Sequence, residues 1–245
     1  MTPRITLAVA SRVLAQLRRD HRTVAMLVLL PCLLITLMWW MFTNSPQTFD
    51  RIGGPLLAVF PAIIMFIVTS VATLRERTSG TLSRLFTMPM AKLDFLLGYA
   101  LAFALIAVVQ GTVVVLISLY ALGLDVHGPA WQLVVVAALD GVLGSTLGLF
   151  ASAFASTEFQ AVQMMPALMI PQLLLCGLLI PRDQLPDVLH AISVVMPLSY
   201  AVDAVQGVMT DQGIGSGAGG DVLIVVAFIL GAVVLGAATL KRRTA

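Results

Sequence analysis

Six long apolar segments constrain this sequence more than any other feature. They cover residues 24–42, 56–74, 95–121, 131–154, 161–180 and 222–240. Each is close to the roughly 20 apolar residues that an α-helix needs to cross a bilayer. Hydrophobic residues make up 59% of the 245 residues and charged residues only 11%, a composition that excludes a soluble domain. We therefore predict an all-α membrane protein with six transmembrane helices, forming a single membrane domain over residues 1–245.

The cationic residues lie mostly on one side of this predicted topology. When successive loops alternate sides, Arg51 and Arg182 fall on one face, and the other twelve of the 14 Lys and Arg residues fall on the opposite face. That face also holds both termini and the basic tail at residues 241–245. Because cytoplasmic loops are enriched in Lys and Arg, we predict that both termini are cytoplasmic. The expected location is a cell membrane, which the chain crosses several times.

The first 22 residues have the pattern of an amphipathic helix. Apolar residues recur along one face at Ile5, Val9, Val13 and Leu17. Arginines occupy the other face, and basic amphipathic helices of this kind lie in the plane of the lipid headgroups. We predict an interfacial helix over residues 1–22, followed by the six-span bundle over residues 24–240. A solvated N-terminal arm is the alternative.

The segment 75–89, RERTSGTLSRLFTMP, is a markedly polar run between the second and third spans. Its charged groups are costly in hydrocarbon, so the segment must lie at a membrane face. A short helical pattern begins at Thr81 and places apolar residues on one side, at Leu82, Leu85 and Phe86. We predict a short amphipathic helix at which a soluble partner docks. The alternative is a plain loop whose charges only fix the topology.

A second segment, residues 181–221, precedes the last span on the opposite face. Apolar residues recur at helical spacing on both sides of Pro197, and neither half is long enough to cross a bilayer. We predict two short helices that dip into the outer leaflet and return. An external amphipathic hairpin is nearly as compatible with this pattern.

One ionisable residue stands in the middle of a predicted span. Asp140 lies about ten residues into the fourth span, which is roughly mid-bilayer, and a carboxylate at that depth indicates function by default. The residues that follow at steps of four are small, and they form a stripe for close helix packing at Gly144, Gly148 and Ser152. Asp140 either lines a solute path or makes a hydrogen bond at a helix contact.

Other side chains at depth are weaker candidates for a solute path. They are Gln110, Gln172, Met165 and Met169. A glutamine in a span also serves as a hydrogen-bonding contact between helices, and methionines also serve as ordinary core. We therefore treat these four residues as secondary candidates beside Asp140.

The sequence carries no signal for a catalytic, nucleotide or metal site. Its two lysines, Lys92 and Lys241, do not lie in the G-x-x-x-x-G-K-[ST] pattern that binds nucleotide phosphates. The three histidines are isolated from one another, without metal-ligand spacing. We expect a protein that is not an enzyme and that holds no cofactor of its own.

Two motifs in this topology resemble the type-2 ABC exporter permeases, and most closely the daunorubicin-resistance type of drug permease. Glu76, Arg77 and residues 80–82 resemble the E-R-x-x-G-T-L-x-x-L…P loop of that family, which also begins R-E-R in the drug permeases. The segment MPLSYAVDAVQG at residues 196–207 is similar to the family pattern N-P-L-T-Y-x-x-x-x-x-R. Gln206 stands where many members carry an arginine.

The resemblance implies a permease subunit that moves solutes when a separate ATPase hydrolyses ATP. It implies a homodimer or heterodimer of permeases with two copies of that ATPase, which holds the ATP and Mg²⁺. Residues carried over to the ATPase contact are Glu76, Arg77, Gly80, Thr81, Leu82, Leu85 and Phe86. Glu76, Arg77 and Arg84 are expected to form polar pairs at the rim of this contact.

The expected solute is hydrophobic or amphipathic, such as a drug, an antibiotic or a lipid-like metabolite. Two alternatives stay open at this point. The first is export of a polysaccharide or glycolipid by the same family, for which a channel richer in aromatic residues than this 7% is typical. The second is a membrane scaffold or sensor subunit without transport. No nucleic acid partner is expected.

Overall fold

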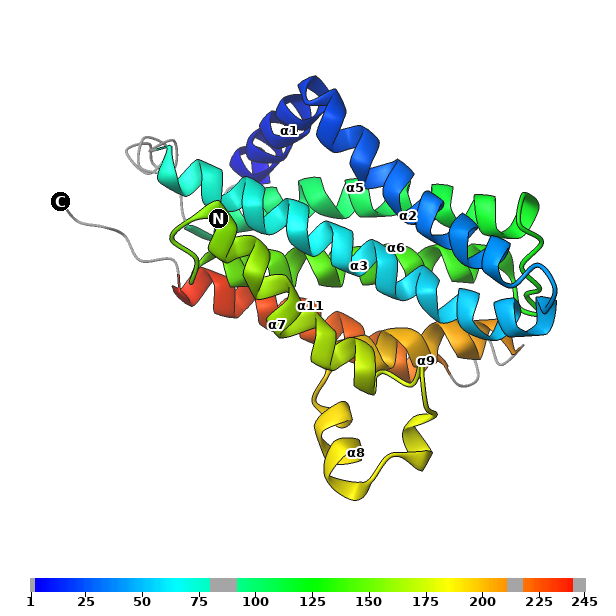
Figure 1. Ribbon diagram of the computed structural model, residues 1–245. Coiled ribbons are helices and arrows are strands. Elements are labelled where there is room, and N and C mark those ends of the chain that lie inside the picture. Colours follow the sequence, from blue (N-terminus) through cyan, green and yellow to red (C-terminus); the bar gives the residue numbers. More distant parts are fainter. Residues whose placement is uncertain (1–2, 80–91, 211–217, 240–245) are drawn as a thin grey trace.

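The computed structural model describes residues 3–79, 92–210 and 218–239, and this part of the chain forms helices joined by loops and turns, without a strand (Figure 1). The helices are α1 (Pro3–Arg19), α2 (His21–Met41), α3 (Pro46–Thr78), α5 (Lys92–Tyr120), α6 (Ala130–Ser152), α7 (Glu158–Leu175), the short 3₁₀ helix η1 (Arg182–Gln184), α8 (Asp187–Val194), α9 (Pro197–Met209) and α11 (Ala218–Thr239). The predicted docking-helix residues Gly80, Thr81, Leu82, Leu85 and Phe86, Arg84 beside them, and the tail at 241–245 lie outside the described residues.

Within the described ranges, five helices are long and apolar enough to cross a membrane: α2, α3, α5, α6 and α11. A sixth span results if α8 and α9, which meet at an angle of 88°, count as one broken span. The prediction of an all-α membrane protein is therefore confirmed. The fifth predicted span, 161–180, is shorter in the structure, because α7 ends at Leu175 and Gly177 adopts a left-handed conformation with φ of 92°.

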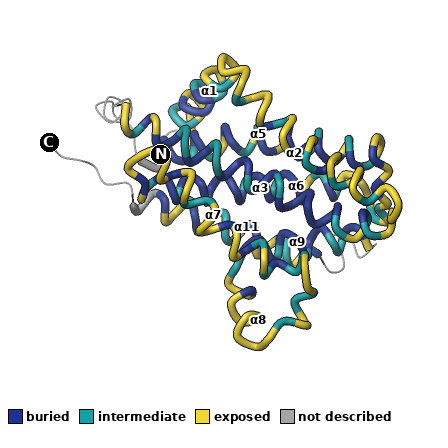
Figure 2. The backbone as a smooth tube through the Cα atoms, in the orientation of Figure 1, coloured by how far each residue is buried: buried dark blue, intermediate teal, exposed yellow. Residues whose placement is uncertain are grey.

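The packed centre of the bundle is the contact between α3 and α6. Figure 2 shows buried residues concentrated along these two helices, whereas α8 is largely exposed. A Cβ atom on Gly144 would overlap the carbonyl oxygen of Ala62, and one on Gly148 would crowd that of Phe66. Small side chains thus let the two backbones approach closely, as in other membrane helix pairs. With 33 residues, α3 is about 50 Å long and exceeds the ~30 Å hydrocarbon core.

The N-terminal amphipathic helix packs against protein. The apolar face of α1 buries Val9 and Val13 in a cluster with Phe95 and Tyr99 of α5. Gly98 of α5 permits this approach, because a Cβ there would lie 2.6 Å from Cβ of Val9. The prediction of an amphipathic N-terminal helix is confirmed, and α5 covers part of its apolar face. That the helix lies in the headgroup plane stays a prediction.

A sharp elbow joins α1 to α2. The carboxylate of Asp20 caps α2 by accepting hydrogen bonds from the backbone N–H of Thr23 at 3.2 Å and from its hydroxyl at 2.6 Å. A side-chain cap of this kind starts a new helix at once, so α2 leaves in a new direction directly after α1 ends. Figure 1 shows the elbow of α1 and α2 standing away from the rest of the bundle.

The segment before the last helix divides into two unlike halves. In α9, the side chains of Ala201, Val202 and Val205 are fully buried among α3, α6 and α11. In α8, Val188 and Val195 just beyond its end are each 71% exposed, and Figure 1 shows this helix projecting from the bundle. Only the second half of the predicted helical pair is therefore packed into the bundle.

Candidate functional site

Three consecutive charged residues at the end of α3 contact three different helices. Successive side chains of an α-helix point about 100° apart, so neighbours in sequence face different partners. Arg75 pairs with Glu158 of α7, and Glu76 pairs with Arg12 of α1. Arg77 donates a short hydrogen bond to the carbonyl oxygen of Ser152, at the end of α6. The end of α3 is therefore the junction of α1, α6 and α7.

Glu76 is the buried member of this group, with 6% of its surface exposed. Nη1 of Arg12 lies 3.4 Å from both of its carboxylate oxygens, and Nε2 of Gln16 donates to Oε1 at 3.1 Å. Arg12 also donates from Nη2 to the hydroxyl of Tyr99 in α5, at 3.1 Å. These four side chains, which we call the Glu76 cluster, join α1, α3 and α5 in one polar network.

The partners of Glu76 differ from those expected. Arg77 and Arg84 were expected to pair with it, but Arg77 points to Ser152 and Arg84 lies outside the described residues. The sequence analysis missed Arg12, Gln16 and Tyr99. Arg12 and Gln16 stand four residues apart on α1, at the edge of its apolar face, and this spacing is the one signal that indicates a shared partner.

The Arg75–Glu158 pair, in contrast, is exposed. Nε and Nη2 of Arg75 donate to the two carboxylate oxygens of Glu158 at 2.8 and 3.1 Å. These hydrogen bonds lower the pKa of Glu158. The two side chains are 61% and 52% exposed, and exposed ion pairs contribute little to stability.

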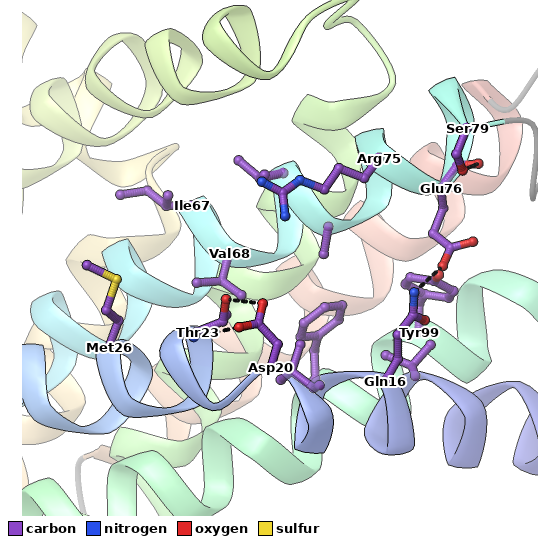
Figure 3. Close-up of a pocket in the computed structure, with 15 residues that line it drawn as sticks. Gln16, Asp20, Thr23, Met26, Ile67, Val68, Arg75, Glu76, Ser79 and Tyr99 are labelled. Atoms are coloured by element: carbon purple, nitrogen blue, oxygen red, sulfur yellow. Dashed lines mark hydrogen bonds between the residues drawn. The ribbon is translucent and has the colours of Figure 1, made fainter.

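A cavity of about 470 Å³ lies beside the Glu76 cluster, between the α1–α2 elbow, α3 and α5 (Figure 3). At one edge it is lined by polar side chains, Gln16, Asp20, Arg75 and Glu76. The rest of its wall is apolar and includes Met26, Ile67, Val68, Val71 and Phe103. The pKa of Asp20 is lowered, chiefly by the hydrogen bond from the Thr23 hydroxyl, so its carboxylate is ionised at neutral pH.

Asp140, the main candidate for a solute path, is completely buried in α6. Within the described residues, neither of its carboxylate oxygens has a hydrogen-bond partner. An ionised carboxylate that is buried without a hydrogen-bond partner has a high free-energy cost. Asp140 lines neither the cavity of Figure 3 nor the outer pocket described below.

The secondary candidates lie in two separate places. Gln110 donates to the carbonyl oxygen of Leu27 in α2 at 2.8 Å. Gln172 accepts from the backbone N–H of Leu198 at 3.3 Å and so links α7 to the start of α9, with Met169 one turn before it. Met165 packs against the small cluster that contains Met169. Each glutamine therefore has a structural hydrogen bond between helices.

An outer pocket of about 710 Å³ lies at the opposite end of the bundle. Charged residues line it on several elements, among them Asp50, Asp125 and Asp183. Arg182 forms an ion pair with Asp203 of α9 and lies over the ring of Tyr200, 5.0 Å from its centroid. Gln206, the residue at the family's arginine position, also lines this pocket.

Comparison with known proteins places these features in a family context. Residues 5–210 match the family model described as ABC-2 type transporter. The chain is 28% identical over 148 residues to the probable multidrug ABC transporter permease YbhR of Escherichia coli (strain K12), covering 60% of this chain and 40% of that protein. It is 25% identical over 159 residues to the inner membrane transport permease YhhJ of the same strain, covering 64% and 42%.

A eukaryotic relative is also named an ABC transporter. The chain is 28% identical over 148 residues to ABC transporter G family member 20 of Dictyostelium discoideum, covering 60% of this chain and 20% of that protein. The chain therefore spans less than half the length of these relatives.

Proposed function

The chain belongs to the ABC-2 type transporter family, and we propose that it is the membrane-spanning permease subunit of an ATP-driven exporter. A separate ATPase subunit, in two copies, binds ATP and Mg²⁺ and drives a dimer of permeases. In this proposal the Arg75 end of α3 faces the cytoplasm, in agreement with the distribution of Lys and Arg.

The observation that carries the proposal is the Glu76 cluster. Glu76 belongs to the segment 75–89 that resembles the family's coupling loop, and its contacts fix α1 to the end of α3. Buried, hydrogen-bonded charge pairs of this kind hold a specific arrangement, because separating them leaves a buried charge without a partner. A movement imposed on α1 or on the coupling loop therefore reaches α3.

From α3 the movement reaches the centre of the membrane. The close contacts of Gly144 and Gly148 with the backbone of α3 make α3 and α6 move as one body. Asp140 lies on α6 one turn from Gly144, so it shares this motion. We propose that the solute path includes Asp140. The residues that we propose for coupling to the ATPase are Glu76, Arg77, Gly80, Thr81, Leu82, Leu85 and Phe86.

We propose that the solute is hydrophobic or amphipathic. Support comes from the relative YbhR, which is named a probable multidrug permease. Gln110, Gln172, Met165 and Met169 remain secondary candidates for the path. Export of a polysaccharide or glycolipid is the second candidate.

The test is reconstitution of this chain with the ATPase encoded beside it. Proteoliposomes containing both subunits are loaded with ATP, and movement of a panel of drugs, lipids and oligosaccharides is measured. The control complex carries a partner whose Walker A lysine is replaced by alanine. ATP-dependent movement of amphipathic solutes supports the proposal. A complex that assembles and hydrolyses ATP but moves none of the panel indicates a scaffold or sensor.

A further inference from the structure

The cavity of Figure 3 opens toward the lipid-facing surface of α2. Met26 lines the cavity and is 66% exposed. The next outward-facing residues of α2 are also apolar and exposed, with Leu29 at 64% and Leu33 at 60%. In a membrane, such a surface contacts acyl chains, so an acyl chain can enter the cavity beside Met26 without crossing water.

The walls of the cavity are divided into an apolar and a polar part. Figure 3 shows Ile67, Val68 and Met26 away from the edge at which Gln16 and Glu76 are hydrogen-bonded. A volume of about 470 Å³ is within the roughly 300–1,000 Å³ of small-molecule sites. The occupant that matches these walls is amphipathic, with an apolar chain inside and a polar group at the elbow.

The charges around the elbow select the sign of that polar group. Arg18, Arg19 and Arg22 flank Asp20 and are exposed, and no ion pair involves them within the described residues. Arg12 and Arg75 are already balanced by Glu76 and Glu158. Asp20, Arg75 and Glu76 are the charged residues in the cavity wall, and the three exposed arginines lie beside its edge. The elbow as a whole carries five arginines (Arg12, Arg18, Arg19, Arg22 and Arg75) and three carboxylates (Asp20, Glu76 and Glu158), so the surface beside the cavity is positive. Basic pockets between membrane helices bind anionic lipid headgroups.

We propose that this cavity is a binding site for one anionic phospholipid. One acyl chain lies between α2, α3 and α5, and the phosphate lies against the arginines of the α1–α2 elbow. The bound chain contacts the side of α3 that carries Glu76, so the lipid holds α1 and α3 together. The proposal concerns lipid binding alone and is tested without any transport measurement.

The first test measures thermal unfolding of the purified chain in a neutral maltoside detergent. Phosphatidylglycerol or phosphatidylcholine is added in increasing amounts, and native mass spectrometry counts the bound lipids. A ligand at about 100 times its dissociation constant stabilises a protein by roughly 2.7 kcal/mol, which corresponds to about 5–10 °C for a chain of this size. We expect a rise of this order with phosphatidylglycerol and a smaller one with phosphatidylcholine.

Val71→Trp fills the cavity and should abolish the rise with both lipids. Val71 lines the cavity, and its side chain belongs to none of the buried apolar clusters, so the larger ring replaces the lipid rather than core contacts. The matched control is Leu33→Trp, which adds the same ring to the lipid-facing surface of α2 and should respond as the wild type does.

Two double variants test whether the lipid headgroup binds through its charge. Arg18→Gln with Arg19→Gln removes two guanidinium groups at the elbow and should remove the preference for phosphatidylglycerol while keeping the response to phosphatidylcholine. Arg4→Gln with Arg51→Gln removes the same charge at distant exposed positions and should keep the preference.

Two results would overturn the proposal. One is an equal response to phosphatidylglycerol in the Val71→Trp variant and the wild type, which places the lipid elsewhere. The other is stabilisation by tetraphenylphosphonium, a cationic amphipath, with none by phosphatidylglycerol, which makes the cavity a solute site. Neither result bears on whether the chain is a permease.

Discussion

At the scale of single residues, neighbouring charges at the end of α3 have very different roles. Glu76 is buried and has three polar contacts with α1, whereas the adjacent Arg75 is exposed in a pair with Glu158. The free energy of such pairs depends on burial, because water screens exposed charges and penalises unpaired buried ones. Glu76 was identifiable from its motif alone. Its partner Arg12 was not, because the contact joins residues 64 positions apart.

We predict that Arg12→Met destabilises the chain by about 2–3 kcal/mol. This loss is smaller than the ~3–5 kcal/mol that removing one partner of a fully buried ion pair costs, because the Arg12 side chain is 33% exposed. Thermal unfolding in detergent measures the change, with Glu158→Gln as a control that should cost less than about 1 kcal/mol. The double variant Arg12→Met with Glu76→Met should recover part of the loss. A single variant as stable as the wild type would show that the pair contributes nothing.

A second prediction at this scale concerns Asp140. If its carboxylate faces the solute path, Asp140→Asn should reduce transport of cationic solutes at least several-fold more than transport of neutral solutes. The amide keeps the shape of the side chain and removes only the capacity for charge. Initial rates of uptake into proteoliposomes for a matched cationic and neutral pair measure this effect. Equal losses for both solutes would assign Asp140 to helix packing.

At the scale of helices, periodicity was enough to predict most elements but not what they contact. The pattern predicted a helix over residues 1–22, and α1 covers Pro3–Arg19. It did not indicate that α5 covers the apolar face, since lipid and protein present the same chemistry to such a face. The pattern also did not predict that α7 ends at Leu175. Apolar residues continue to Ile180, but the backbone leaves the helical conformation before Gly177.

The glycines of α6 give a prediction at this scale. Gly144→Ala should destabilise the chain by roughly 1–3 kcal/mol, because the new methyl group would overlap the backbone of α3 and the helices must separate. Gly231→Ala in α11 is the control: a Cβ there meets nothing within 4 Å, and alanine favours the helix by about 0.5–1 kcal/mol. Thermal unfolding of both variants measures these changes in stability. Equal stabilities would mean that α3 and α6 are not in close contact.

At the scale of the whole molecule, composition and two motifs were enough to predict the class and family, and the family match over residues 5–210 confirms that resemblance. The sequence could not indicate how energy enters the bundle, because that depends on contacts between distant helices. We propose that the Glu76 cluster supplies this link. The chain spans less than half the length of the relatives it matches.

The most direct test of the central claim is the ATPase rate of the reconstituted complex, with and without solute, in the Glu76→Gln variant. The amide keeps a hydrogen bond to Gln16 but loses the charge that holds Arg12, so α1 is released from α3 while the fold is retained. We predict that stimulation by solute falls at least tenfold while basal hydrolysis by the partner remains. Glu158→Gln, in the exposed ion pair with Arg75 that joins α7 to the same end of α3, should behave as the wild type. Full stimulation and transport in Glu76→Gln would contradict the claim that α1 and α3 transmit the movement.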